Sequence, residues 1–207
     1  MIRLLFVGDG ERDAAMNPHL VRTITGIRVE PTARPWARLN AAGRGYECKL
    51  LFAIRDARDR QLDGVVATVD QDKSRGRDRL RELVAARAKD REYAAPLPTA
   101  VGVANPHAEA WLLDDPVAVR TALGLGTGVQ IPNVRTARNP KSDLNGLQSM
   151  SERRDEPVRT VLADIARSVD RRRCQHARET GFAAFVDELR GEIGPLARQD
   201  QPPSASS

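Results

Sequence analysis

Three acidic residues stand close together directly after the first apolar run of the chain. Residues 2–8 read IRLLFVG, and Asp9, Glu11 and Asp13 follow within the sequence GDGERD. Carboxylates at such spacing can hold a hard divalent cation or exchange protons with a substrate. A simpler interpretation also stands: a glycine turn before a helix, whose N-terminal dipole favours Asp9 and Asp13.

A second acidic pair follows another apolar run. Residues 64–70 read GVVATVD, and Asp70 and Asp72 alternate in VDQDKS. If the backbone stays extended, both carboxylates point to one side, and their repulsion raises one pKa unless a cation intervenes. Mg²⁺ or Mn²⁺ suits such oxygen ligands. The alternative is that Asp72 begins a turn or caps a helix.

Two further motifs carry candidate groups. Glu109 lies in NPHAEAWLLDD, where it could also be an ordinary acid of a first helical turn, and His107 is expected to be a surface or cap residue. Lys141, in RNPKSDL, and Lys73 lie beside motifs in a chain that otherwise uses mostly Arg. A lysine near a metal site can stabilise negative charge on a phosphate.

The elements that must position these residues alternate between strands and helices. Strands are predicted at 2–8, 64–70 and 99–104, and helices at 14–24, 46–62, 77–90 and 107–115. In the helix 77–90, Leu80, Leu83 and Val84 are expected to face inward. The pattern predicts an α/β fold with a mostly parallel sheet and helices on both faces. Ligands of such sheets bind at the carboxyl ends of the strands, where these acids converge.

The rest of the chain divides at about residue 150. Residues 124–150 are rich in Gly, Asn and Pro and are predicted to form irregular loops, while 152–192 carry two helical patterns broken near 171–180. We therefore expect an α/β domain at 1–150, a C-terminal helical extension at 151–195, and a disordered tail at 196–207.

Composition narrows the class of protein. The 207 residues carry a net charge of +5, which favours an anionic partner such as nucleic acid. The two cysteines stand far apart, so a structural zinc site is not expected. No apolar run is long enough to span a membrane, and the N-terminal run is too short for a signal peptide. We expect a cytoplasmic protein without a membrane partner.

Two families are similar to these motifs. VGDGERDAAM resembles the last motif of haloacid dehalogenase-type phosphatases, GDGxxD, and VVATVDQDKS resembles their first, DxDx[TS], but the order is reversed here. TOPRIM domains keep the order, with an acid after the first strand and DxD after a later one. Small bacterial TOPRIM-like proteins, related to OLD-type nucleases and often encoded beside ATPases, also have a motif similar to NPHAEAWLLDD. This resemblance covers roughly residues 1–145.

The TOPRIM resemblance implies Mg²⁺-dependent (or Mn²⁺-dependent) cleavage of DNA or RNA. By position, Asp9, Asp70 and Asp72 would hold the metal, with Asp9 in place of the usual Glu. Asp13 matches the acid four residues on, Glu109 the acid before the Trp-Leu-Leu of the late motif, and Lys141 a late lysine. The catalytic residues would be Asp9, Asp13, Glu109 and Lys141, together with Glu11 as a possible substitute for the longer Glu arm.

The resemblance also implies partners. It is compatible with an effector subunit beside an ATPase in phage defence, and the C-terminal helices are candidates for a homodimer contact. Two other functions stay open. One is a phosphatase or phosphotransferase with Asp70 as nucleophile, and the other is a non-catalytic regulatory or nucleic-acid-binding subunit that keeps the fold.

Overall fold

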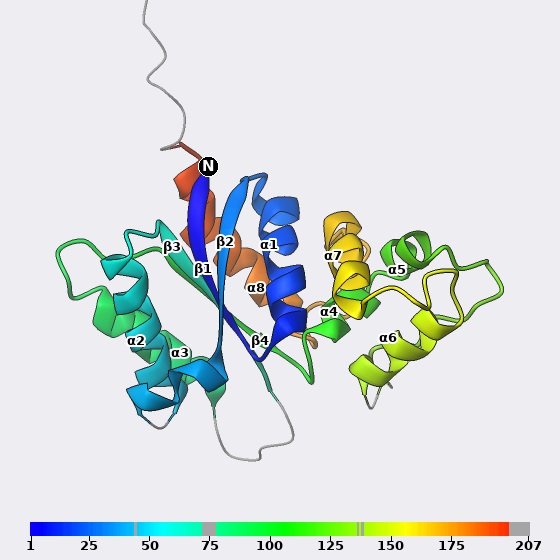
Figure 1. Cartoon of the computed structure of the whole chain (residues 1–207), viewed down its shortest axis with the longest axis horizontal. Helices are drawn as coiled ribbons and strands as arrows, with labels where there is room; N and C mark the ends of the chain where they lie inside the picture. The colour runs from blue at the N-terminus through cyan, green and yellow to red at the C-terminus, as the bar shows by residue number, and fades with distance from the viewer. Residues whose placement is uncertain (44, 72–77, 136, 138, 199–207) are drawn as a thin grey trace, which may run out of the picture.

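The sheet of this protein is parallel throughout. The computed structural model describes residues 1–43, 45–71, 78–135, 137 and 139–198. Its sheet has four strands, β1 (Ile2–Gly8), β2 (Val29–Pro35), β3 (Gly64–Asp70) and β4 (Thr99–Ala104), in the order β2-β1-β3-β4 (Figure 1). Because β1 connects to β2 on one side and the chain then crosses to β3 on the other, the sheet has a topological switch point between β1 and β3.

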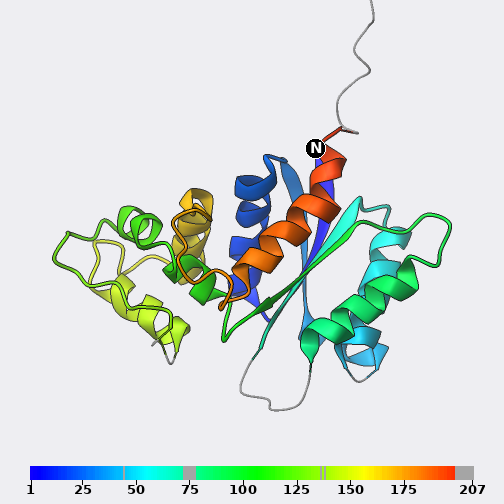
Figure 2. The same cartoon turned by 180° about the vertical axis from the view of Figure 1, so that it is seen from behind.

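Helices cover both faces of the sheet, as predicted. On one face lie α2 (Tyr46–Asp59), α3 (Arg79–Asp90) and the 3₁₀ helix η1 (Trp36–Ala42). On the other lie α1 (Glu11–Thr25) and α8 (Phe182–Glu188), and α7 (Val158–Ser168) packs against α1 (Figure 2). Consecutive strand residues enter opposite cores: Leu4 and Phe6 pack with α1, Leu5 and Val7 with α2. Burial on both faces explains why the central strands are continuous apolar runs.

The remaining helices extend the α1 side. They are α4 (Glu109–Leu113), α5 (Pro116–Leu123), α6 (Pro140–Ser149), the π-helical η2 (Leu189–Ile193) and the 3₁₀ helix η3 (Gly194–Arg198). Trp111 of α4 is fully buried and stacks on Phe182 and Phe185 of α8, with ring centroids 5.8 and 4.7 Å away. The hydrophobic core therefore crosses the boundary that we expected at residue 150.

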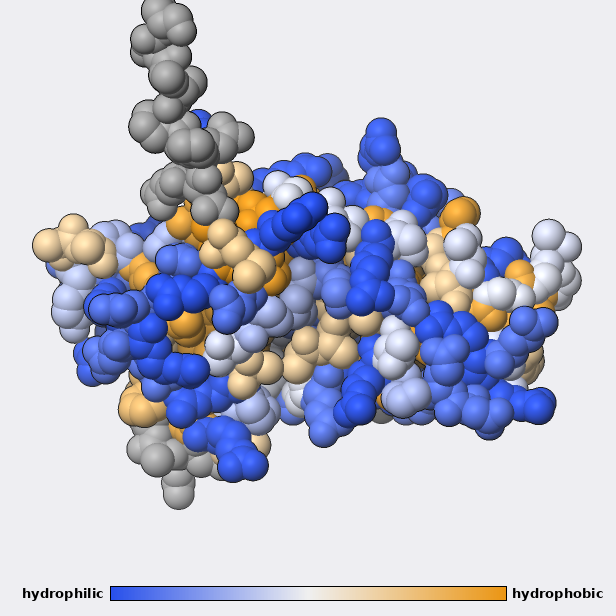
Figure 3. All heavy atoms as spheres, turned by 45° about the horizontal axis from the view of Figure 1, so that its top comes forward, coloured by the Kyte–Doolittle hydropathy of each residue, from blue (hydrophilic) through white to orange (hydrophobic). Residues whose placement is uncertain are grey.

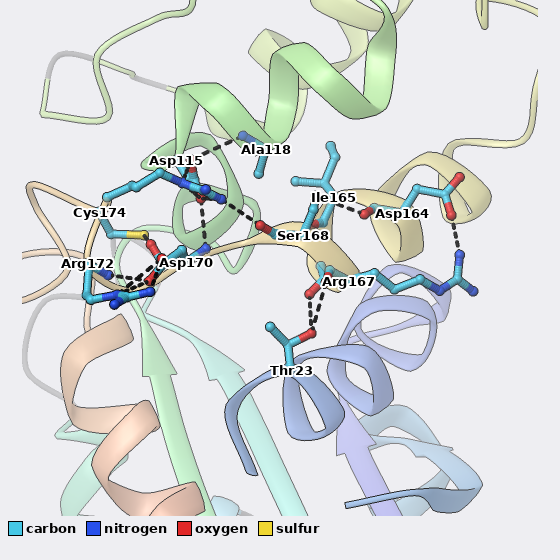
Figure 4. A network of polar contacts seen from close by, with 12 residues as sticks. Thr23, Asp115, Ala118, Asp164, Ile165, Arg167, Ser168, Asp170, Arg172 and Cys174 are labelled. Atoms are coloured by element: carbon cyan, nitrogen blue, oxygen red, sulfur yellow. Dashed lines mark hydrogen bonds and ion pairs between the residues drawn. The ribbon is translucent and has the colours of Figure 1, made fainter. Parts of the chain in front are cut away.

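Polar contacts also tie the C-terminal helices to the sheet domain (Figure 4). The Thr23 hydroxyl of α1 donates to the Ala166 carbonyl of α7 at 3.0 Å. Asp115, which is fully buried, caps α5 by accepting from the Ala118 N–H at 3.1 Å. It also accepts from the Asp170 N–H at 2.8 Å, and the Arg173 guanidinium lies 2.7 Å away, both in the segment after α7. These contacts fix α5 and α7 against α1.

The structure corrects four predictions. Residues 124–150 are not all irregular, because α6 occupies 140–149. Its start is encoded locally: the Asn139 side chain accepts from the Ser142 N–H, and Pro140 is the first helical residue. Leu80 and Val84 do not face inward; they are 45% and 38% exposed, and only Leu83 is buried.

The other two corrections concern the sheet and the C-terminal tail. Strand β2 was missed because Pro31 and Pro35 interrupt its pattern, which a strand at the sheet edge tolerates. Residues 194–198 form η3 with Leu196 buried, so the ordered chain passes residue 195; the remainder of the expected tail, 199–207, lies outside the described residues.

The surface gives no sign of a large apolar face in the view of Figure 3, where hydrophobic residues form small separate areas among hydrophilic ones. Within the part of the chain that the structure describes, no helix has the length and apolar character needed to cross a membrane.

Candidate functional site

Asp9 and Asp70 meet at the switch point of the sheet. Asp9 follows β1 directly and Asp70 is the last residue of β3, the neighbouring strand. The Asp70 backbone N–H donates to Oδ2 of Asp9 at 3.0 Å. Two residues that are 61 positions apart are thus brought together by parallel pairing alone.

Asp13 closes the turn between β1 and α1. Its Oδ2 accepts from the backbone N–H groups of Asp9 and Gly10, at 2.8 and 3.1 Å. Gly8 is required here, since a Cβ at that position would lie 2.5 Å from the Asp13 Cβ. The helix begins at Glu11, three residues before the predicted start, so Glu11 and Asp13 both lie in its first turn. The helix-start interpretation of Asp13 is therefore correct, and the same side chain also lines the site.

The Asp70 carboxylate has a partner on each oxygen. Oδ1 accepts from the Ala108 N–H at 3.0 Å, and Oδ2 lies 3.0 Å from Nδ1 of His107. Lys141 Nζ donates to the same Oδ2 at 2.9 Å. Lys141 lies in the first turn of α6, whose start is set by Asn139 and Pro140, and it contacts Asp70 although the two residues are 71 positions apart.

Glu109 is buried and paired. It is 2% exposed at the start of α4, and Arg12 of α1 donates to its Oε1 at 2.8 Å. The Arg12 guanidinium also reaches Oδ1 of Asn145 in α6, at 3.0 Å. Arg12 therefore holds α1, α4 and α6 together beside the acids.

These side chains surround a cavity of about 550 Å³. It is lined by Asp9, Glu11, Arg12, Asp13, Asp70, Glu109, Lys141 and Arg159, among others. Glu11 is exposed at its edge. A pocket of this size matches those that hold small molecules or single nucleotide units.

The acids shift one another's proton affinity. Burial, followed by the charges of Asp70, Asp9 and Glu109, raises the pKa of Asp13 to about 7. Burial also raises the pKa of Asp9, and the Asp70 charge adds to that. Burial alone would lower the pKa of Lys141, but the hydrogen bond to Asp70 and the nearby carboxylates outweigh it and raise that pKa.

The structure thus brings together six of the predicted residues. Asp9, Glu11, Asp13, Asp70, Glu109 and Lys141 all line the cavity. Asp72 and Lys73 lie outside the described residues. The expectation for His107 was wrong in part: it is half-buried and contacts Asp70 rather than standing free on the surface.

Besides Arg159, which lines the cavity, sequence reasoning missed two basic residues that contact Glu109 or Asp70. One is Arg12, which stands inside the acidic motif GDGERD and could have been found there as a counter-charge. The other is Arg79, whose guanidinium donates to the Asp70 carbonyl and lies 5.3 Å over the Tyr46 ring. No sequence signal singled out Arg79 among the many arginines of the chain.

The donor set can be compared with what a divalent cation needs. Asp9, Asp13 and Asp70 offer carboxylate oxygens only, which suits Mg²⁺ or Mn²⁺. Burial is the main cause of the raised pKa values of Asp9 and Asp13, and the charge of Asp70 adds to it; a cation would relieve that repulsion. The side chains are not in the positions of a complete metal site: in the described ranges, no group of three His, Cys, Asp or Glu is placed to hold a metal ion. The residues therefore fit Mg²⁺ or Mn²⁺ in the type of ligand atom and in charge.

No protein-family model, curated protein or solved structure matches this chain.

Proposed function

We propose that this protein is a Mg²⁺- or Mn²⁺-dependent nuclease that hydrolyses phosphodiesters of DNA or RNA. The observation that carries the proposal is the convergence of Asp9, Asp13, Asp70 and Glu109 with Lys141 on one cavity at the switch point of a parallel sheet. The resemblance of the motifs to TOPRIM proteins supports the same function, and their order along the chain agrees with it.

The cation would be held by Asp9 and Asp70, with Asp72 as a further candidate ligand. When bound, it supplies Lewis-acid stabilisation of the phosphoryl oxygens and a water of lowered pKa. Asp9 keeps its position through the backbone N–H of Asp70, 3.0 Å from its Oδ2. This contact fixes the spacing between the two proposed ligands.

The other side chains act on protons and charge. Asp13, with a pKa of about 7, is suited to accept a proton from the attacking water at Oδ1, while Oδ2 stays bound to backbone N–H groups. Lys141 Nζ lies at the cavity and would neutralise charge on the phosphoryl oxygens. Glu109 holds Arg12 in place and is a positioning residue. Glu11, exposed at the edge, would act in the outer shell.

The pairing of the acids favours a second candidate, a non-catalytic subunit that keeps the fold. Asp70 is bound to Lys141 and Glu109 to Arg12, as expected of a stable polar network. A phosphatase with Asp70 as nucleophile has less support, because the GDGxxD-like and DxD motifs occur in the reverse of that family's order. An ATPase partner subunit and a homodimer stay predictions.

Calorimetric titration with MnCl₂, combined with cleavage of single- and double-stranded DNA and RNA, separates these functions. The variants are Asp70→Asn and, as a matched control, Asp187→Asn on the exposed side of α8. For the nuclease, wild type and control bind Mn²⁺ and cleave, and Asp70→Asn does neither. Mn²⁺ binding that Asp70→Asn does not weaken, or the absence of cleavage with any of these substrates, would contradict the proposal.

A further inference from the structure

A second cavity of about 560 Å³ lies beside the acidic one, between α1, α7 and the edge strand β2. Four arginines line it: Arg22 at the end of α1, Arg28 before β2, and Arg159 and Arg167 at the two ends of α7. We name it the arginine groove. No local pattern of residues predicts it, because the charge of the C-terminal helices is balanced overall.

The positive charge of the arginine groove is largely uncompensated. Among the described residues that line it, none is acidic. Arg22, Arg28 and Arg159 are exposed, and no ion pair involves them within the described part of the chain. Arg167 is the exception, since it pairs with Asp164 of its own helix. Such a cluster attracts an anion with several charges.

His19 adds no positive charge to the groove. Burial, followed by the charge of Arg167, lowers its pKa, and the Arg167 guanidinium lies 3.2 Å from Nε2. A neutral imidazole in this position accepts from the guanidinium and orients it. The arginines, rather than the histidine, therefore set the charge of the groove.

The arginine groove and the acidic cavity share a residue. Arg159, in the first turn of α7, lines both. A phosphodiester chain whose reacting phosphate lies by Asp9 and Asp70 would continue past Arg159 toward Arg22 and Arg28. Ala14, Ala15 and Pro18 form a floor without long side chains, so a backbone can approach closely.

We infer that the arginine groove binds the phosphates of a single nucleic-acid strand that flank the phosphodiester in the acidic cavity. This rests on the proposed function. A cavity of about 560 Å³ has room for one or two nucleotides of a strand but not for a duplex. None of the described lining residues is Phe, Tyr or Trp, and the His19 ring is bound to the Arg167 guanidinium, so the contacts are with phosphates rather than stacked bases, and binding is independent of sequence.

The test is fluorescence anisotropy of the full chain with a labelled single strand of about 20 nucleotides in EDTA, which prevents metal-dependent cleavage. The groove variant is Arg22→Gln/Arg28→Gln. The matched control is Arg38→Gln/Arg81→Gln, which removes the same charge from exposed positions on the α2–α3 side. Circular dichroism confirms that both variants fold.

We expect the groove variant to raise the Kd about fivefold for each arginine, the upper end for an exposed ion pair. The slope of log K against log salt falls by about 1.4, since each phosphate contact on a single strand contributes about 0.7. The control changes the Kd by less than about threefold.

The outcomes separate the two proposals. Equal losses in the groove and control variants, together with metal-dependent cleavage, overturn the groove and leave the nuclease. A selective loss in the groove variant without cleavage by the wild type supports the groove and overturns the nuclease in favour of a binding subunit. No binding of the strand by the wild type overturns the groove whatever the cleavage result.

Discussion

The pair between Arg12 and Glu109 allows a quantitative test of the site's electrostatics. Glu109 is 2% exposed and Arg12 28%, and their charged atoms lie 2.8 Å apart. Arg12→Met removes the charge but keeps much of the side-chain length, and leaves the Glu109 carboxylate buried near Asp13. Breaking a buried pair in this way costs about 3–5 kcal/mol. Because water reaches Arg12, we expect the free energy of unfolding to fall by about 2–4 kcal/mol.

The converse variant should be milder. Glu109→Gln leaves Arg12 partly in water and still able to bind Asn145, so we expect a loss of about 1 kcal/mol. The double variant Arg12→Met/Glu109→Gln removes both charges and should be about as stable as Glu109→Gln alone. The coupling energy then equals the cost of Arg12→Met, about 2–4 kcal/mol, as expected of charged residues in direct contact.

Urea unfolding followed by circular dichroism measures all three variants. The exposed pair of Lys89 and Glu47 is the control, since these side chains are 56% and 35% exposed. Lys89→Met should leave the free energy of unfolding nearly unchanged, because water screens an exposed ion pair. If Arg12→Met costs no more than Lys89→Met, Glu109 is not a buried charge that depends on Arg12, and our account of the site's electrostatics is wrong.

Three further predictions concern single residues. Because burial and nearby acids raise the folded-state pKa of Asp13 to about 7, above its ordinary value of 3.8, folding favours the protonated form. In EDTA, the free energy of unfolding of the wild type should fall by up to about 1.4 kcal/mol per pH unit as the pH rises from about 4 to 7, and that of Asp13→Asn should fall less. Parallel pH profiles of the two proteins in urea unfolding would exclude this. Burial raises the pKa of the Cys174 thiol to about 12, whereas Cys48 is exposed. A thiol reagent should therefore label Cys48 quickly and Cys174 only after unfolding, and rapid labelling of both in the native state would contradict the fold there. Gly181 has φ +82°, and a Cβ would lie 2.1 Å from a backbone oxygen of β4. Gly181→Ala should lower the free energy of unfolding by more than about 2 kcal/mol. Gly146→Ala, in open space within α6, should raise it by up to about 1 kcal/mol. If Gly181→Ala were the more stable of the two variants, the packing of α8 against β4 would be refuted.

Much of the fold could be predicted because its central strands are buried on both faces. The ranges 2–8, 64–70 and 99–104 match β1, β3 and β4, since continuous apolar runs leave little choice. The edge strand β2 and helix α6 lack that signal: the first contains two prolines, and the second lies in a segment rich in Gly, Asn and Pro. In α3, the spacing of Leu80, Leu83 and Val84 predicted that all three face the sheet, but only Leu83 is buried.

The sequence by itself determined that Asp9 and Asp70 lie together, because acids that follow neighbouring parallel strands must reach the same edge of the sheet. Only the tertiary structure decided their partners. Arg12 meets Glu109 across 97 residues, and Lys141 meets Asp70 across 71, because α4 and α6 pack beside α1. The raised pKa of Asp13 and the arginine groove have the same origin. Burial and the distances between charges depend on how helices pack, and no local pattern of residues encodes them.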